Sequence, residues 1–230
     1  MVAVLRSAFL VAFLALTVAG PAAAFAQDGE AGAAPSAPAA QTHDEALKTP
    51  AGKFVQDLGD RAIAIIADKN VNPAQRNEKF QTILSDSFDL MTIGRFVIGR
   101  SWNTATPDQQ KEYMKLFQAL VVKSYGDRLT LYTGEGFQVT AARPESDKDF
   151  IVASQITHPD GSQPTVIDWR VRQRNGKLGV IDVVVEGVSL SVTQRQEYSA
   201  VIQQHGGQID GLLAVMRKQL ETPEPASNAG

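Results

Sequence analysis

The chain has 230 residues, a formal net charge of −3 and no cysteine. The lack of cysteine excludes both disulfide staples and a lipid anchor attached to cysteine. A mildly acidic chain without a polybasic run gives no electrostatic reason to expect nucleic acid as a partner, or a patch that binds anionic membranes.

The first 26 residues have the pattern of a secretory signal. Arg6 precedes a short apolar run, "AFLVAFLALTV", and the segment ends in "AFA". A basic start, a short apolar run and a small-x-small ending are typical of Sec-type signal peptides. We therefore expect residues 1–26 to be a signal peptide that is cut after Ala26. The alternative, an uncleaved membrane anchor, usually has a longer apolar run.

Composition divides the rest of the chain into three parts. Residues 27–50 are rich in Ala, Pro and Gly and lack an apolar period, and residues 221–230 are similar. This composition predicts a flexible tether and a disordered tail. Residues 51–220 are enough for one domain that buries most of its apolar surface.

The first half of this domain is predicted to be helical. Apolar residues recur at the helical period in residues 54–66 and again in residues 80–88, and Asn72-Pro73 supplies a start signal for the second helix. The segment "FDLMTIGRFVIGRSW" that follows is expected to form one or two short helices with breaks at Gly94 and Gly99.

The strongest helix start in the chain is "TATPDQQ". Thr106 is a favourable N-cap, Pro107 takes the first helical position, and Gln109 completes a capping box. We expect a long amphipathic helix from this point, with its apolar face toward the interior.

After Gly134 the apolar period becomes that of strands. Four segments are bounded by turn residues: "GFQVTAA", "DFIVASQITH", "PTVIDWRVRQ" and "LGVIDVVV". Asn175-Gly176 joins the last two and is a strong signal for a two-residue hairpin. Two further helices are expected, one on each side of Gly206-Gly207. The order predicts an α+β fold with an antiparallel meander sheet.

Apolar residues occur on both faces of some predicted strands. In the fourth strand, alternation places Ile181, Val183 and Val185 on one face and Val180 and Val184 on the other. In the second strand it places Ile151 and Ala153 opposite Phe150, Val152 and Ile156. In the third it places Ile167, Trp169 and Val171 opposite Val166, Asp168, Arg170 and Arg172. Either helices cover both faces, or the sheet curls one face around something apolar.

No constellation of catalytic or metal-binding residues stands out. The three histidines lie in separate segments and have no cysteine to help them hold a metal. Ser189 lies in "GVSLS", which lacks the second glycine of a nucleophile elbow. Asp168 and Asp182 are candidate acids within the sheet, and a buried Asp182 would need a partner. A structural hydrogen bond and a role as general base both stay open for Asp182.

Two long segments resemble a known family. They are "FVIGRSWNTATPDQQKEYMKLFQALVVKSYGDRLTLYTGEGFQV" and "VIDVVVEGVSLSVTQRQEY". Both are similar to the periplasmic phospholipid-binding proteins called MlaC, or toluene-tolerance auxiliary proteins. The similarity extends from about residue 52 to residue 218, and the end of the chain also resembles members found in hopanoid-producing genomes.

The resemblance implies a fold and a function. Members of this family have a curved antiparallel sheet related to the NTF2-like fold, packed with flanking helices around an apolar cavity. They are periplasmic carriers that move phospholipid between an outer-membrane lipoprotein-porin complex and an inner-membrane ABC transporter with an MCE-domain protein. This activity maintains the lipid asymmetry of the outer membrane. A monomer without a cofactor or a catalytic role is therefore expected.

The resemblance also implies a set of apolar residues that would contact lipid. They are Phe96, Val97, Trp102, Phe117, Leu120, Val121, Tyr125, Leu129, Ile151, Ala153, Ile167, Trp169, Val171, Ile181, Val183, Val185 and Val188. Phe117, Leu120, Val121 and Leu129 are expected to face Ile167, Trp169 and Val171 across the lipid. Two alternatives stay open: an NTF2-like enzyme that uses Asp182 or Asp168 as a base on an apolar substrate, and an envelope interaction module without a ligand.

Overall fold

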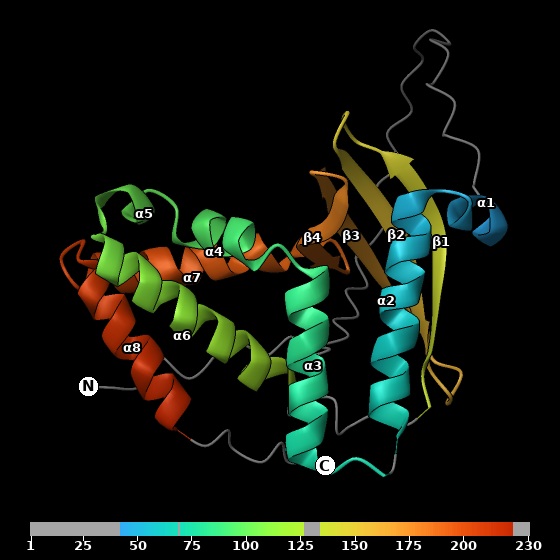
Figure 1. Ribbon diagram of the computed structural model, residues 1–230, viewed down its shortest axis with the longest axis horizontal. Helices are drawn as coiled ribbons and strands as arrows, with labels where there is room; N and C mark the ends of the chain where they lie inside the picture. Colours follow the sequence, from blue (N-terminus) through green and yellow to red (C-terminus); the bar gives the residue numbers. More distant parts are fainter. Residues whose placement is uncertain (1–41, 69, 127–133, 223–230) are drawn as a thin grey trace, which may run out of the picture. The chain divides into compact units, whose positions relative to one another are not determined.

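The computed structural model describes residues 42–222, except residue 69 and residues 127–133. The expected signal peptide, most of the tether, Leu129 and the tail from residue 223 lie outside these residues. The domain begins with the helices α1 (His43–Leu47), α2 (Pro50–Ala67), α3 (Pro73–Ser87), α4 (Leu90–Ile98), α5 (Ser101–Thr104) and α6 (Pro107–Gly126). The strands β1 (Gly136–Pro144), β2 (Asp149–Thr157), β3 (Thr165–Arg174), β4 (Lys177–Val185) and β5 (Val188–Ser189) follow, and then α7 (Leu190–Gln204) and α8 (Ile209–Glu221) (Figure 1). This order confirms the predicted α+β class.

Local signals set the helix starts. The backbone N–H of Gln109 donates to the Thr106 hydroxyl at 3.2 Å, and the Gln109 side chain accepts from the Thr106 N–H at 2.9 Å, so the predicted capping box is confirmed. Asn72 and Gln75 form the same arrangement before α3.

Order begins earlier than the composition suggested. Residues 42–50, which the composition assigned to the tether, include α1 and the start of α2. Thr42 and Thr49 accept hydrogen bonds from the first turns of these helices, and Ala46 is fully buried. The two N-caps therefore outweigh the Ala- and Pro-rich composition of this stretch.

One predicted helix break is wrong and the other is confirmed. Gly94 lies inside α4, whereas Gly99 ends that helix with a φ of 61°. Gly94 is buried against α6, where the Tyr113 hydroxyl donates to its carbonyl oxygen at 2.9 Å. The missing side chain at Gly94 allows close helix packing and does not interrupt the helix.

The sheet is a meander with the order β1-β2-β3-β4-β5, and every neighbouring pair is antiparallel. Asn175 and Gly176 connect β3 to β4 with φ values of 50° and 76°, which confirms the predicted hairpin. The two-residue strand β5 extends the predicted four-stranded sheet by one.

The face of the sheet that carries Trp169 is called the inner face here. Val152 of β2 and Val183 of β4 lie opposite Trp169, and Val180 lies opposite Val171. An irregularity in the pairing of β3 with β4 leaves Ile181 without an opposite residue, so Val180 and Val183 share the inner face. The predicted placement of Val180 on the side of Val184 is therefore wrong.

Buried apolar residues form two clusters. The sheet cluster joins the inner face to α1, α2 and α3, and includes Val55, Leu58, Ile83, Val139, Val152, Val171 and Val180. The helix cluster joins α4, α6, α7 and α8, and includes Val97, Tyr113, Phe117, Tyr198, Leu212 and Met216. Each cluster gives one part of the described domain its own apolar core.

α2 packs closely on the sheet at Gly59. A Cβ atom at Gly59 would lie 2.2 Å from Cδ1 of Phe137, so the ring would have to move. Overpacking of this kind costs about 1–3 kcal/mol, and the better helix propensity of alanine returns about 1 kcal/mol. We expect Gly59→Ala to lower the free energy of unfolding in urea by about 1 kcal/mol. In a Phe137→Ala background the same substitution should become neutral or stabilising; a loss of equal size in both backgrounds would contradict the packing explanation.

Candidate functional site

The inner face is covered unevenly by helices. α1 packs on β1 and α2 packs on β1 and β2, while α3 and α4 pack at β4 (Figure 1). Trp169 lies on β3, between these two groups of helices, and its side chain is only half-buried. The rings of Phe88 and Phe137 meet it edge to face, with centroids 6.5 Å and 6.2 Å away. With the half-buried Val183 opposite, these residues form what we call the Trp169 cluster: Phe88, Phe137, Trp169 and Val183.

The only polar group of the Trp169 side chain has a partner inside the protein. The indole Nε1 donates to the hydroxyl of Ser154 at 2.8 Å, and that hydroxyl donates to the carbonyl oxygen of Ile167 at 3.1 Å. Ser154 is 1% exposed, so its bond to Ile167 is buried, and the bond from Trp169 is partly buried. The exposed part of the cluster is therefore apolar, so a ligand that contacts it needs no hydrogen-bonding group there.

The opposite, outer face of the sheet is polar around β3. Arg170 pairs with Glu145 at 2.7 Å and Arg172 pairs with Asp149 at 2.7 Å. The Arg172 guanidinium, through its hydrogen bonds, holds the pKa of the Asp149 carboxyl below its ordinary value. Ile151 lies opposite Arg170 in the register between β2 and β3.

The expected lipid contacts are therefore split between the two faces of the sheet. Ile167, Trp169, Val171, Val183 and Val185 share the inner face. Ala153 lies opposite Asp168, on the outer face with Ile151. Ile181 is half-buried and has no residue opposite it in β3. Val188 in β5 is 54% exposed.

The expected contacts from the helical half lie in or around the helix cluster. Val97 and Phe117 are buried there, and Trp102, Leu120 and Val121 are partly buried against it. Trp102 meets the Tyr113 ring edge to face at 6.4 Å, and the Arg95 guanidinium lies over the Trp102 ring at 5.2 Å. These residues do not share a cluster with Ile167, Trp169 and Val171, so the predicted arrangement, in which the two groups face each other, is not seen.

Three further expected contacts remain. Phe96 is 42% exposed on α4. Tyr125 belongs to the last turn of α6, and Leu129 lies outside the described residues.

Asp182 has three hydrogen-bond donors around its carboxylate. It is 8% exposed, and it accepts from the Ser189 hydroxyl at 2.6 Å, the Val183 N–H at 2.9 Å and the Ser191 N–H at 3.1 Å. Ser189 in turn caps α7 by accepting from the Val192 N–H. The carboxylate thus fixes the junction between β4, β5 and α7. Asp168, the other candidate base, is half-buried on the outer face.

Two aromatic residues of the Trp169 cluster, Phe88 and Phe137, are not among the contacts expected from the sequence. Phe137 occurs two residues before the buried Val139, and alternation therefore puts both on one face of β1. Phe88 ends the apolar stripe of α3 and bridges to Val180 through the backbone. The strand alternation could have found Phe137, but the bridge of Phe88 to β4 joins residues far apart in the sequence.

The described part of the chain contains neither a membrane-spanning helix nor a cluster of metal ligands. None of its helices combines the length and the hydropathy that a membrane span requires. Its histidines and acidic residues do not gather in groups of three or more that could hold a metal ion.

Comparisons with known proteins give consistent matches. Residues 56–218 match the model of a family described as MlaC protein. The chain is 25% identical over 177 residues to the intermembrane phospholipid transport system binding protein MlaC of Haemophilus influenzae, covering 74% of this chain and 82% of that protein. It is 24% identical over 140 residues to toluene tolerance protein ttg2D of Pseudomonas putida, covering 60% of this chain and 65% of that protein.

The fold also matches a solved structure. A phospholipid-binding protein from Ralstonia solanacearum, determined in complex with a phospholipid, gives a TM-score of 0.64 at 23% identity. The match covers 74% of this chain and 98% of that one. This likeness supports the predicted α+β fold of the NTF2-like kind.

Proposed function

Because the chain belongs to the MlaC family, we propose that it is a periplasmic carrier that holds the acyl chains of a phospholipid against the Trp169 cluster. It moves lipid between an outer-membrane lipoprotein-porin complex and an MCE-type ABC transporter of the inner membrane, and so maintains outer-membrane lipid asymmetry. It needs neither a cofactor nor a catalytic residue for this work. The names of its relatives, which are phospholipid transport and phospholipid-binding proteins, support this proposal.

One observation carries the proposal: aromatic and aliphatic side chains on the inner face stay half-exposed between two groups of helices. Two acyl chains contain roughly 30 methylenes, and each costs about 0.8 kcal/mol to leave in water. A carrier must therefore keep most of this apolar surface out of water, because exposing it would cost on the order of 20 kcal/mol. The Trp169 cluster can cover such a surface, because it is apolar and its indole N–H already has a hydrogen-bond partner.

The headgroup is expected to contribute little to recognition. Arg170 and Arg172 are the cations closest along the chain to Trp169, but each already pairs with a carboxylate on the outer face. Replacing both by Gln should leave the amount and the classes of co-purified phospholipid unchanged, as measured by mass spectrometry of an organic extract. Selective loss of anionic lipids from the double variant would instead identify these arginines as headgroup ligands.

Organic extraction of the purified native protein distinguishes the proposed carrier from its alternatives. Co-purified phospholipid in near-stoichiometric amount is the expected result. A small ring-type molecule would favour an enzyme that uses Asp182 or Asp168 as a base. An extract without any ligand would favour an envelope interaction module.

A further inference from the structure

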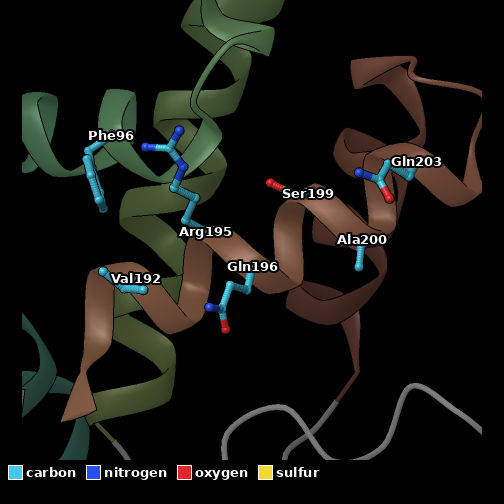
Figure 2. A pocket seen from close by; sticks show the side chains of 7 residues that line it. All are labelled: Phe96, Val192, Arg195, Gln196, Ser199, Ala200 and Gln203. Atoms are coloured by element: carbon cyan, nitrogen blue, oxygen red, sulfur yellow. The ribbon is translucent and has the colours of Figure 1, made fainter. Parts of the chain in front are cut away.

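A groove of ≈ 520 Å³ lies between α4 and α7, outside the Trp169 cluster (Figure 2). Figure 2 shows Phe96 of α4 on one side and a row of α7 side chains along the floor. The α7 residues that line it are Val192, Arg195, Gln196, Ser199, Ala200 and Gln203. Their spacing of three and four residues defines one face of the helix. The groove is therefore lined by one face of α7 together with Phe96 of α4.

Most of the exposed large apolar side chains of the described residues lie on α4, on α7 or just before α7. Phe96 and Val192 line it and are each 42% exposed. Met91 on α4 is 50% exposed, and Val188 lies just before α7 and is 54% exposed. Of the large apolar side chains in the described residues, only Val166 is similarly exposed elsewhere, on β3. Exposed apolar side chains that gather on two packed elements, as α4 and α7 are, are typical of an interaction site.

The same region is positively charged, although the chain as a whole is acidic. Arg95, Arg100 and Arg195 take part in no ion pair among the described residues. Instead, the Arg195 guanidinium lies over the Phe96 ring at 4.9 Å. A guanidinium stacked on a ring keeps its full charge and its hydrogen-bond donors for a partner. Along α4, α5 and α7 the only acidic side chain is Glu197, which accepts from Gln194.

We propose that this groove docks an acidic amphipathic helix of a partner protein. Carboxylates of that helix would pair with Arg195, which lines the groove, and its apolar side chains would cover Phe96 and Val192. The small side chains of Ser199 and Ala200 let a helix backbone approach α7 closely. A flat anionic membrane would satisfy the arginines but could not reach the floor of a groove. The groove is separate from the Trp169 cluster, because no residue of that cluster lines it.

A designed peptide tests the groove with the full-length protein. The probe is a helical peptide of about 18 residues with Leu and Ala on one face and Glu along its edges, and a scrambled peptide of the same composition is the control. Binding is followed by fluorescence polarisation. The helical peptide should bind measurably more tightly than the scrambled one, and Arg195→Glu should weaken it by about tenfold or more. Ala200→Trp, which fills the floor, should weaken it to a similar extent. Equal affinity for both peptides, or no effect of either substitution, would overturn the proposal.

Two further measurements identify the occupant. A photo-crosslinking amino acid at Ser199, in cells that naturally make the protein, should give a protein adduct whose crosslinked segment is acidic and amphipathic. The same amino acid at Gln138, on the outer face, is the control and should not give that adduct. An adduct with a second copy of this chain would contradict the proposal. So would binding to phosphatidylglycerol vesicles that Arg195→Glu abolishes, because the groove region would then recognise a membrane surface.

Discussion

Val183→Glu is expected to reduce co-purified phospholipid by about tenfold or more, because it puts a carboxylate against acyl chains. Val183 lies opposite Trp169 on the inner face and is half-buried. A carboxylate at this position would either lose its hydrating water, which is costly, or prevent the acyl chains from binding. The matched control is Val166→Glu, since Val166 lies on the outer face of β3 and is 48% exposed. That variant should retain lipid like the native protein.

The amount of lipid is measured per folded protein, after circular dichroism and thermal unfolding have checked both variants. Val183→Phe provides a second test that introduces no charge: its larger ring should reduce the space for acyl chains and lower the lipid content. If Val183→Glu and Val183→Phe are both folded and carry the native amount of lipid, the Trp169 cluster is ordinary core and the proposed site is misplaced.

Asp182→Ala is expected to lower the free energy of unfolding by about 3 kcal/mol or more. It leaves the Ser189 hydroxyl and the N–H groups of Val183 and Ser191 without their acceptor. A buried donor without a partner costs about 1–3 kcal/mol. Urea unfolding measures the change.

Asp168→Ala serves as the comparison, because Asp168 is half-buried on the outer face. Its loss should cost less than about 1 kcal/mol. Equal stability of Asp182→Ala and the native protein would show that the junction between β4 and α7 does not depend on this carboxylate. Stability would then no longer explain why a carboxylate is buried there.

The features that could be predicted from the sequence are those that depend on neighbouring residues. Thr106 with Gln109, and Asn72 with Gln75, satisfy the free N–H groups of the first helical turn, so each start can be recognised within four residues. Asn175-Gly176 adopts the positive φ values that a tight hairpin requires.

The features that could not be predicted depend on distant parts of the chain. The irregularity at Ile181 moves Val180 to the inner face, and strict alternation gives no sign of it. The period of α6 shows that Phe117 and Leu120 face the interior, but it does not show which of the two clusters they join. In the structure both belong to the helix cluster, where α6 packs against α4 and α8. For the same reason, the sequence could not divide the expected lipid contacts between two clusters.

The two tryptophans of the chain provide the most direct test of where the lipid lies. Trp169 belongs to the proposed site, and Trp102 packs against Tyr113 in the helix cluster. Each can be observed alone, Trp169 in a Trp102→Phe variant and Trp102 in a Trp169→Phe variant. The protein is loaded with phospholipid that carries bromine on its acyl chains, which quenches tryptophan fluorescence at short range, and is compared with protein loaded with the unbrominated lipid. We predict strong quenching of Trp169 and little quenching of Trp102. Unchanged emission from Trp169 in protein that demonstrably holds the brominated lipid would contradict the proposed site.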